Sequence, residues 1–126
     1  MITIKTKRIY EEPIKSDGFR ILVDRLWPRG IRKDQAQVDV WYKDIAPSDA
    51  LRQWFGHEPA RWDEFKRRYV KELQDKDDNI ESIIAKRSGK RVTLLYGAKD
   101  EQHNNAVVLK EFIERKIKME KGQEKR

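Results

Sequence analysis

Two short apolar runs constrain the fold of this chain more than any other feature. Residues 19–26 contain the unbroken run Ile21, Leu22 and Val23, and residues 91–96 read RVTLLY. A continuous apolar run of this length between turn signals is typical of a strand buried on both faces, as in a parallel sheet. We therefore predict two buried strands at these positions, with residues 19–26 as the best candidate for a central strand.

The remaining segments predict a third strand and several helices. Residues 2–10 combine β-branched residues with an alternation of apolar and polar side chains, which favours a strand with one solvent-exposed face near a sheet edge. Residues 13–18 are predicted to form a turn. Ser48 is a suitable N-cap for a helix that ends at Gly56, and residues 59–73 predict a second helix. Apolar residues at helical spacing mark these two helices: Leu51, Trp54, Phe55, Trp62, Phe65, Tyr69 and Leu73.

Two more helices follow by the same reasoning. Asn79 is placed to cap a helix with Ile80, Ile83 and Ile84 inside and Gly89 just past its end. A long amphipathic helix after residue 100 carries Ala106, Leu109, Phe112, Ile113 and Ile117. Residues 31–47 are left irregular, with a short extended piece at residues 38–41.

The order strand, helices, strand, helix predicts an α/β fold with a small parallel or mostly parallel sheet flanked by helices. A chain of 126 residues is the size of one domain. We assign that domain to residues 1–119 and expect residues 120–126 to form a charged, frayed tail.

The charge balance narrows the classes of partner. The formal net charge is +7, which favours an acidic partner such as a phosphorylated metabolite or nucleic acid. Residues 114–126 hold six basic and three acidic residues, so a net of +3 lies in the tail. The chain has no cysteine, which excludes disulfides, thiolate nucleophiles and Cys-based metal sites. No apolar stretch approaches the roughly 18 residues of a membrane span, so we expect a cytoplasmic protein without membrane contact.

The loops after the two buried strands contain the candidate site. Ligands bind outside the carboxyl ends of strands in open parallel sheets, where loops and helix N-termini converge. If the two strands are parallel neighbours, their loops meet. The candidate residues are Asp24, Arg25, Trp27, Arg29, Tyr96, Lys99, Asp100, His103 and Asn104.

These residue types divide into two groups by chemistry. Arg25, Arg29 and Lys99 can hold a phosphate or carboxylate, and Trp27, Tyr96 and Asn104 complete a ligand-binding set. Asp24, Asp100 and His103 are the candidate catalytic groups, as base, carboxylate nucleophile or proton donor.

Each role has a structural alternative. Asp100 is equally suited to cap the following helix, Asp24 and Arg25 to form an ion pair at a strand end, and Trp27 to cover the core. His57 more often makes a local hydrogen bond in its turn. The spacing of His57 and His103 does not predict a metal site, and nucleotide or hydrolase motifs are absent, so we expect no metal and no cofactor.

Four sequence blocks resemble the YeaO-like branch of the domain-of-unknown-function 488 (DUF488) family. They are GFRILVDRLWPRG (18–30), WYKDIAPS (41–48), LRQWFGH (51–57) and TLLYGAKDEQHNNAVVL (93–109), and together they span most of the chain. The resemblance implies an α/β fold and a small bacterial or archaeal cytoplasmic protein, and it supplies no established reaction. Other branches of the family carry cysteines near the positions of Tyr96 and of His103 and Asn104, so a thiol mechanism does not transfer to this chain.

Three hypotheses for function follow. The first is an enzyme or sensor that takes a small anionic ligand, nucleotide-like or a sugar phosphate, between the two loops. The second is a structural or interaction protein without catalysis. The third, ranked last, is nucleic-acid binding, because Glu64 lies among the basic residues Arg67, Arg68 and Lys71 on the polar face of the helix at 59–73. The residues carry no indication of an oligomeric state.

Overall fold

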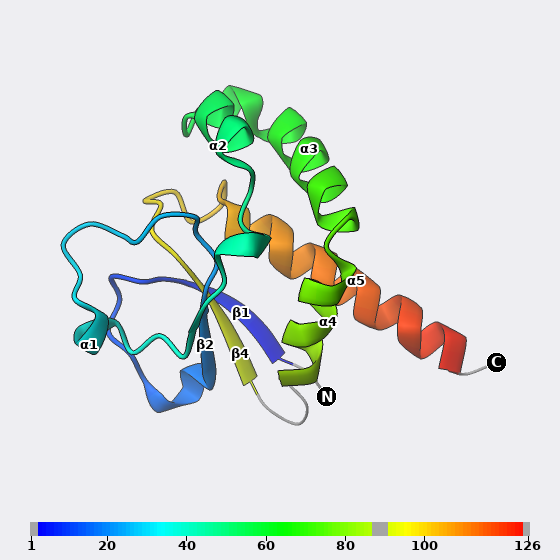
Figure 1. The fold of residues 1–126 in the computed structure, drawn as a ribbon, viewed down its shortest axis with the longest axis horizontal. Helices are drawn as coiled ribbons and strands as arrows, with labels where there is room; N and C mark the ends of the chain where they lie inside the picture. The colour runs from blue at the N-terminus through cyan, green and yellow to red at the C-terminus, as the bar shows by residue number, and fades with distance from the viewer. Residues whose placement is uncertain (1–2, 87–90, 125–126) are drawn as a thin grey trace.

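The protein is built on a four-stranded sheet in the order β1-β4-β2-β3, with every neighbouring pair parallel. The computed structural model describes residues 3–86 and 91–124. The strands are β1 (Thr3–Arg8), β2 (Phe19–Leu22), β3 (Val40–Trp41) and β4 (Arg91–Tyr96). Helices pack beside this sheet (Figure 1), so the predicted α/β fold is confirmed.

The two apolar runs form the adjacent inner strands of the sheet. β2 pairs with β4 from Phe19 opposite Val92 to Leu22 opposite Leu95, and β1 lies at one edge as predicted. Ile21, Leu22 and Val23 are fully buried. β2 is shorter than the predicted strand because the chain leaves the sheet after Val23, where the Asp24 carboxylate turns to accept a bond from Gly97.

The four predicted helices are present, and their ends follow local capping chemistry. In α2 (Asp49–Phe55), the Ser48 hydroxyl oxygen accepts a bond from the N–H of Leu51, and Gly56 ends the helix in the left-handed conformation. The 3₁₀ turn η3 (Pro59–Arg61) leads directly into α3 (Trp62–Gln74). The last helix is α5 (Asn105–Glu124).

One predicted helix start is wrong. α4 runs Asp77–Lys86, and the N–H of Ile80 bonds to the carbonyl of Lys76. Asn79 therefore lies within the first turn and does not cap the helix. Acidic Asp77 and Asp78 explain the earlier start, since carboxylates are favoured at a helix N-terminus. Gly89, the predicted helix stop, lies outside the described residues.

The main core lies between the sheet and the long helices. α3, α4 and α5 lie to one side of the sheet in Figure 1, and alternate residues of the strands point toward them. This core includes Ile21, Val23, Val92, Leu94, Phe65, Tyr69, Leu73, Ile80, Ile83, Leu109 and Ile113. The tryptophans of α2 and α3, Trp54 and Trp62, pack against it as the core interpretation predicted.

The opposite face of the sheet is covered by irregular chain instead of long helices. The irregular region 31–47 contains the single turn α1 (Lys33–Ala36), then β3, then the 3₁₀ turn η2 (Lys43–Ile45). A second, smaller apolar cluster joins Leu22 and Leu95 of the sheet to Ile9 and Ala36. Trp27, Ile31, Val38 and Trp41 pack against this cluster. Trp27 therefore covers the end of the core, which was the structural alternative for this residue.

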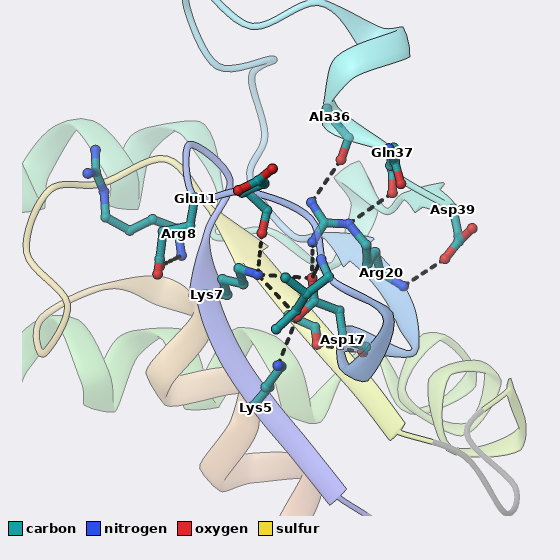
Figure 2. Close-up of polar contacts among 12 residues, drawn as sticks. Lys5, Lys7, Arg8, Glu11, Asp17, Arg20, Ala36, Gln37 and Asp39 are labelled. Carbon is teal, nitrogen blue, oxygen red and sulfur yellow. Dashed lines mark hydrogen bonds and ion pairs between the residues drawn. The ribbon is translucent and has the colours of Figure 1, made fainter.

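A buried ion cluster holds the rest of this face together (Figure 2). Asp17, in the 3₁₀ turn η1 (Lys15–Asp17), is fully buried and accepts bonds from the ammonium groups of Lys5 at 2.8 Å and Lys7 at 3.0 Å. The guanidinium of Arg20 on β2 is its third cationic partner. Burial alone would raise the pKa of Asp17, but the bonds from Lys5, the Ile14 N–H and Lys7 outweigh it and hold that pKa far below its ordinary value.

Arg20 links this cluster to the irregular layer. Its Nε donates to the carbonyl of Gln37 at 2.9 Å and its Nη2 to the carbonyl of Ala36 at 2.8 Å. Its backbone N–H donates to the Asp39 carboxylate at 2.8 Å. Figure 2 shows these bonds running from Arg20 to the residues at and just after the end of α1. One buried guanidinium therefore fixes both the crossover between β1 and β2 and the segment that leads to β3.

Replacement of Asp17 by Asn should lower the free energy of unfolding at pH 7 by about 3–5 kcal/mol, because it leaves the buried Arg20 without its counter-ion. Because the pKa of Asp17 is lower in the folded than in the unfolded protein, its ion pairs contribute their full stabilisation at pH values above the ordinary pKa of 3.8. This stabilisation is lost progressively as the pH falls below that value. Urea unfolding of both proteins across pH 7 to 3 measures the difference and its decline. The control Asp34→Asn removes an exposed pair with Arg32 and should change stability by less than about 1 kcal/mol. A pH-independent difference, or an Asp17→Asn protein as stable as the parent, would contradict this role.

Candidate functional site

A pocket of about 430 Å³ opens at the carboxyl ends of β2 and β4. This volume is within the range of small-molecule sites, roughly 300–1,000 Å³. The loops after both strands, the end of α2 and the start of α5 form its walls. The acidic, basic and histidine side chains in its lining are Asp24, Arg25, Arg29, Arg52, His57 and His103. The site therefore combines one carboxylate with three guanidinium groups and two imidazoles.

Asp24 is the acidic group of the pocket, and the protein fixes its orientation. One carboxylate oxygen accepts the N–H of Gly97 at 2.8 Å, and the other accepts the amide of Asn105 at 3.2 Å. Burial raises the pKa of this carboxyl, while the bonds from Gly97 and Asn105 oppose the rise. The side chain of Asn105 also donates to the carbonyl of Val23, which ties the start of α5 to the end of β2.

The three arginines are held to different degrees. The Nε of Arg25 donates to the carbonyl of buried Pro47 at 3.0 Å, and Arg25 makes no ion pair with Asp24 among the bonds of the described residues. Arg52 pairs with Asp49 one turn earlier on α2, and both side chains are largely exposed. Arg29 is exposed, and within residues 3–86 and 91–124 its side chain forms no hydrogen bond or ion pair. Arg29 is therefore the arginine most free to meet a ligand.

The imidazole of His103 is positioned by two neighbours. Its Nδ1 lies 2.8 Å from the Asp100 carboxylate, and its ring meets Trp62 edge-on at a centroid distance of 5.1 Å. Asp100 also accepts the N–H groups of Gln102 and His103, and together these bonds lower the pKa of Asp100. An ionised Asp100 holds the proton of His103 on Nδ1, which leaves Nε2 for other partners.

The structure divides the predicted site residues into two groups. Asp24, Arg25, Trp27, Arg29, His103 and Asn104 line the pocket. Tyr96, Lys99 and Asp100 do not. Tyr96 is 2% exposed because its side chain points into the helix-side core, and Lys99 lies on the exposed surface of its loop.

Asp100 and Asn104 organise the loop that leads into α5. The Asn104 amide donates to the carbonyl of Asp100 at 2.9 Å, and its side-chain oxygen accepts the N–H of Val107 at 3.0 Å. Asn104 is therefore the helix cap, and Asp100 stabilises the turn before it. The capping role that we considered for Asp100 falls to Asn104 instead.

Sequence reasoning missed Arg52 and treated His57 as a residue of a turn. Both line the pocket, because α2 ends beside the carboxyl ends of the strands. His57 follows Gly56 with a positive φ of 58°, an unusual backbone conformation for a residue with a side chain. The consecutive left-handed residues Gly56 and His57 turn the chain sharply after α2. A basic residue and a histidine at the end of a helix next to a turn were the signal available in the sequence.

Two further findings concern the described residues alone. No group of three or more His, Cys, Asp or Glu side chains among them is arranged to hold a metal ion. None of their helices is both long enough and apolar enough to cross a bilayer.

Fold and site together define a class: a small α/β domain with a ligand-sized, mixed-charge pocket at the carboxyl edge of a parallel sheet. The chain belongs to the DUF488 family, since the family model described as the inactive DUF488-N3 subclade matches residues 3–126. The relatives include the uncharacterised protein YeaO of Escherichia coli K12, 39% identical over 112 residues that cover 89% of this chain and 97% of YeaO. The resemblance seen in the sequence blocks is thereby confirmed.

A second relative is an uncharacterised protein of Mycobacterium tuberculosis H37Rv, 53% identical over 72 residues. This match covers 57% of the chain and 61% of the mycobacterial protein, so it spans less than two thirds of that relative. An uncharacterised protein of Mycobacterium bovis matches to the same extent. No solved structure matches the chain significantly.

Arg25→Ala should lower the free energy of unfolding by about 1–2 kcal/mol, because it removes a charged donor from the buried carbonyl of Pro47. Arg29→Ala provides a matched control four positions away, and we expect it to stay within about 0.5 kcal/mol of the parent. Urea denaturation followed by tryptophan fluorescence measures both. Equal stability of the two variants would show that the Arg25 bond does not hold the Pro47 segment.

Proposed function

We propose that the pocket binds a small anionic ligand and that binding, without turnover, is the function of this protein. The observation that carries the proposal is the composition of the pocket, whose lining contains the cationic or ionisable side chains of Arg25, Arg29, Arg52, His57 and His103 and the single carboxylate of Asp24. Guanidinium groups bind phosphate and carboxylate through paired hydrogen bonds, so this excess of donors favours an anion.

The arrangement of the arginines supports a site that is prepared for a ligand. Arg29 has donors with no protein partner among the described residues, and Arg52 uses one side of its guanidinium for Asp49. α5 begins at the pocket with Asn105, so the positive end of its dipole adds to the field of the arginines. These groups come from three separate segments that the fold brings to one place.

Binding without turnover agrees with two observations. The family model that matches the chain is described as an inactive subclade, and the chain contains no cysteine that could act as a nucleophile. The residues that we considered as catalytic groups then have other roles. Asp24 and His103 contact the ligand, and Asp100 orients His103.

Nucleic-acid binding is less favoured by the surface charges. On α3, Arg67 and Arg68 both pair with Glu64, and Lys66 pairs with Glu111 of α5. Lys116 of α5 pairs with Asp77 and Glu81 of α4. Cations that are already neutralised by neighbouring carboxylates gain less from a phosphate backbone, because fewer counterions are released on binding.

The test is a thermal-shift screen of the protein against pyrophosphate, nucleotides, sugar phosphates and a short DNA duplex, because a ligand bound only by the folded state raises the melting temperature. We expect stabilisation by a phosphate-containing small molecule and at least about tenfold weaker binding in Arg29→Ala and Arg52→Ala, which corresponds to about 1.4 kcal/mol. Calorimetric titration measures the affinities.

Arg67→Ala is the matched control for Arg52→Ala. Both arginines are exposed on helices and pair with an acid three residues earlier, but only Arg52 lines the pocket. We expect Arg67→Ala to bind like the parent. Equal losses in both variants, or stabilisation by the duplex alone, would refute the proposal. If no small anion binds and pocket substitutions alter only stability, the structural or interaction role is the better account.

A further inference from the structure

The acceptor capacity of Asp24 narrows the class of ligand, on the assumption that the proposed anion-binding function is correct. An ionised carboxylate has about four acceptor positions and no donor. In the described part of the chain each Asp24 oxygen accepts one hydrogen bond, from the N–H of Gly97 on one side and from the amide of Asn105 on the other. Among the described residues each oxygen therefore keeps an acceptor position, and Asp24 lines the pocket. A ligand that offers two adjacent donors would satisfy both oxygens at once.

The amides around the pocket argue against a sugar as the body of the ligand. Asn104 bonds to Asp100 and to the N–H of Val107, and Asn105 bonds to Val23 and Asp24. Gln53 donates to Asp49. A sugar phosphate carries hydroxyl groups around its whole body, and these need partners when they are buried, whereas these side chains are already engaged within the protein. In a nucleotide the buried body is the base, and the two ribose hydroxyl groups can stay at the open side of the pocket.

The apolar part of the lining favours a planar body instead. Pro28, Pro47, Phe55 and Phe65 contribute to the walls, and Leu26 is 58% exposed at the pocket. The faces of a flat heterocycle can be buried against such walls at little desolvation cost, and only its edge needs polar partners. The pocket volume of about 430 Å³ also exceeds what a bare phosphate or a small amino acid would fill.

We infer that the ligand is a nucleotide with a guanine-type base, whose two adjacent N–H donors face the Asp24 carboxylate while its phosphate meets the arginines and histidines of the pocket. The paired donors match the two available acceptor positions in the way that a guanidinium matches a carboxylate. A site built to bond two donors rejects analogues that lack one, since a buried acceptor is then left without a partner.

Calorimetric titration of the parent protein with GMP, IMP and AMP tests the inference through the ligand alone. IMP lacks the exocyclic amino group and offers one donor of the pair, and the corresponding edge of AMP presents an acceptor beside a donor. We expect GMP to bind at least about tenfold more tightly than either. This comparison needs no variant, so it stands even if substitutions at Asp24 disturb folding.

Asp24→Asn is the complementary variant, because an amide supplies one acceptor and one donor in place of two acceptors. It should lose the preference for GMP over AMP, whereas Asp77→Asn, which removes an exposed carboxylate outside the pocket, should keep it. Equal affinity for the three nucleotides, or binding of sugar phosphates in preference to all of them, would overturn this inference and leave anion binding in place. Absence of binding by every phosphate compound would overturn both.

Discussion

The rest of the structure depends on the ion pairs of the buried Asp17 carboxylate. The connection between β1 and β2 passes over β4 without an α-helix, and the carbonyl of Asp17 accepts the hydroxyl of Thr93 on that strand at 2.7 Å. Gly18 follows with a φ of 66°, at a point where a Cβ would collide with the backbone carbonyl of Arg91. A crossover this close to the sheet buries polar backbone, and the ion cluster of Asp17 with Lys5, Lys7 and Arg20 supplies partners for it. The Asp17 carboxylate accepts the N–H of Ile14, and Lys7 donates to the carbonyl of Glu12.

This cluster has a consequence for the pocket at the other end of the sheet. Arg20 donates to the carbonyls of Ala36 and Gln37 and so holds the irregular region 31–47 in place. This region directly follows the loop after β2 that lines the pocket. Between these two segments Trp27 donates to the carbonyl of Ile31, and Trp41 donates to the carbonyl of Asp24. The pocket wall is therefore supported by side-chain bonds to backbone rather than by a second layer of helices. A wall that is already held by such bonds before the ligand arrives loses less conformational entropy on binding.

The sequence predicted those parts of the fold in which local patterns and tertiary packing agree. The buried part of RVTLLY is mostly apolar and begins with the β-branched Val92 and Thr93, and β4 coincides with the whole segment. β3 has only two residues, Val40 and Trp41, both partly buried. They lie within the short extended piece expected at residues 38–41, but so short a strand has no periodicity that would place it in the sheet. The cluster around Asp17 was not foreseen, because an acid among lysines looks like ordinary surface until the crossover buries it. Arg52 reaches the pocket only through the packing of α2 beside the sheet, a long-range contact that spacing does not encode, whereas Arg29 and His103 follow the strands directly.

The most direct measurement of the central claim is a two-dimensional ¹H–¹⁵N NMR titration of the protein with GMP. The account predicts that the largest shifts fall on the backbone amide of Gly97 and the side-chain amide of Asn105, which bond to Asp24, and on the amides of Gly56 and His57 at the end of α2. Amides on the exposed faces of α3 and α5 should remain unchanged. Shifts confined to those helix faces, or none at saturating nucleotide, would contradict the assignment of the pocket as the functional site.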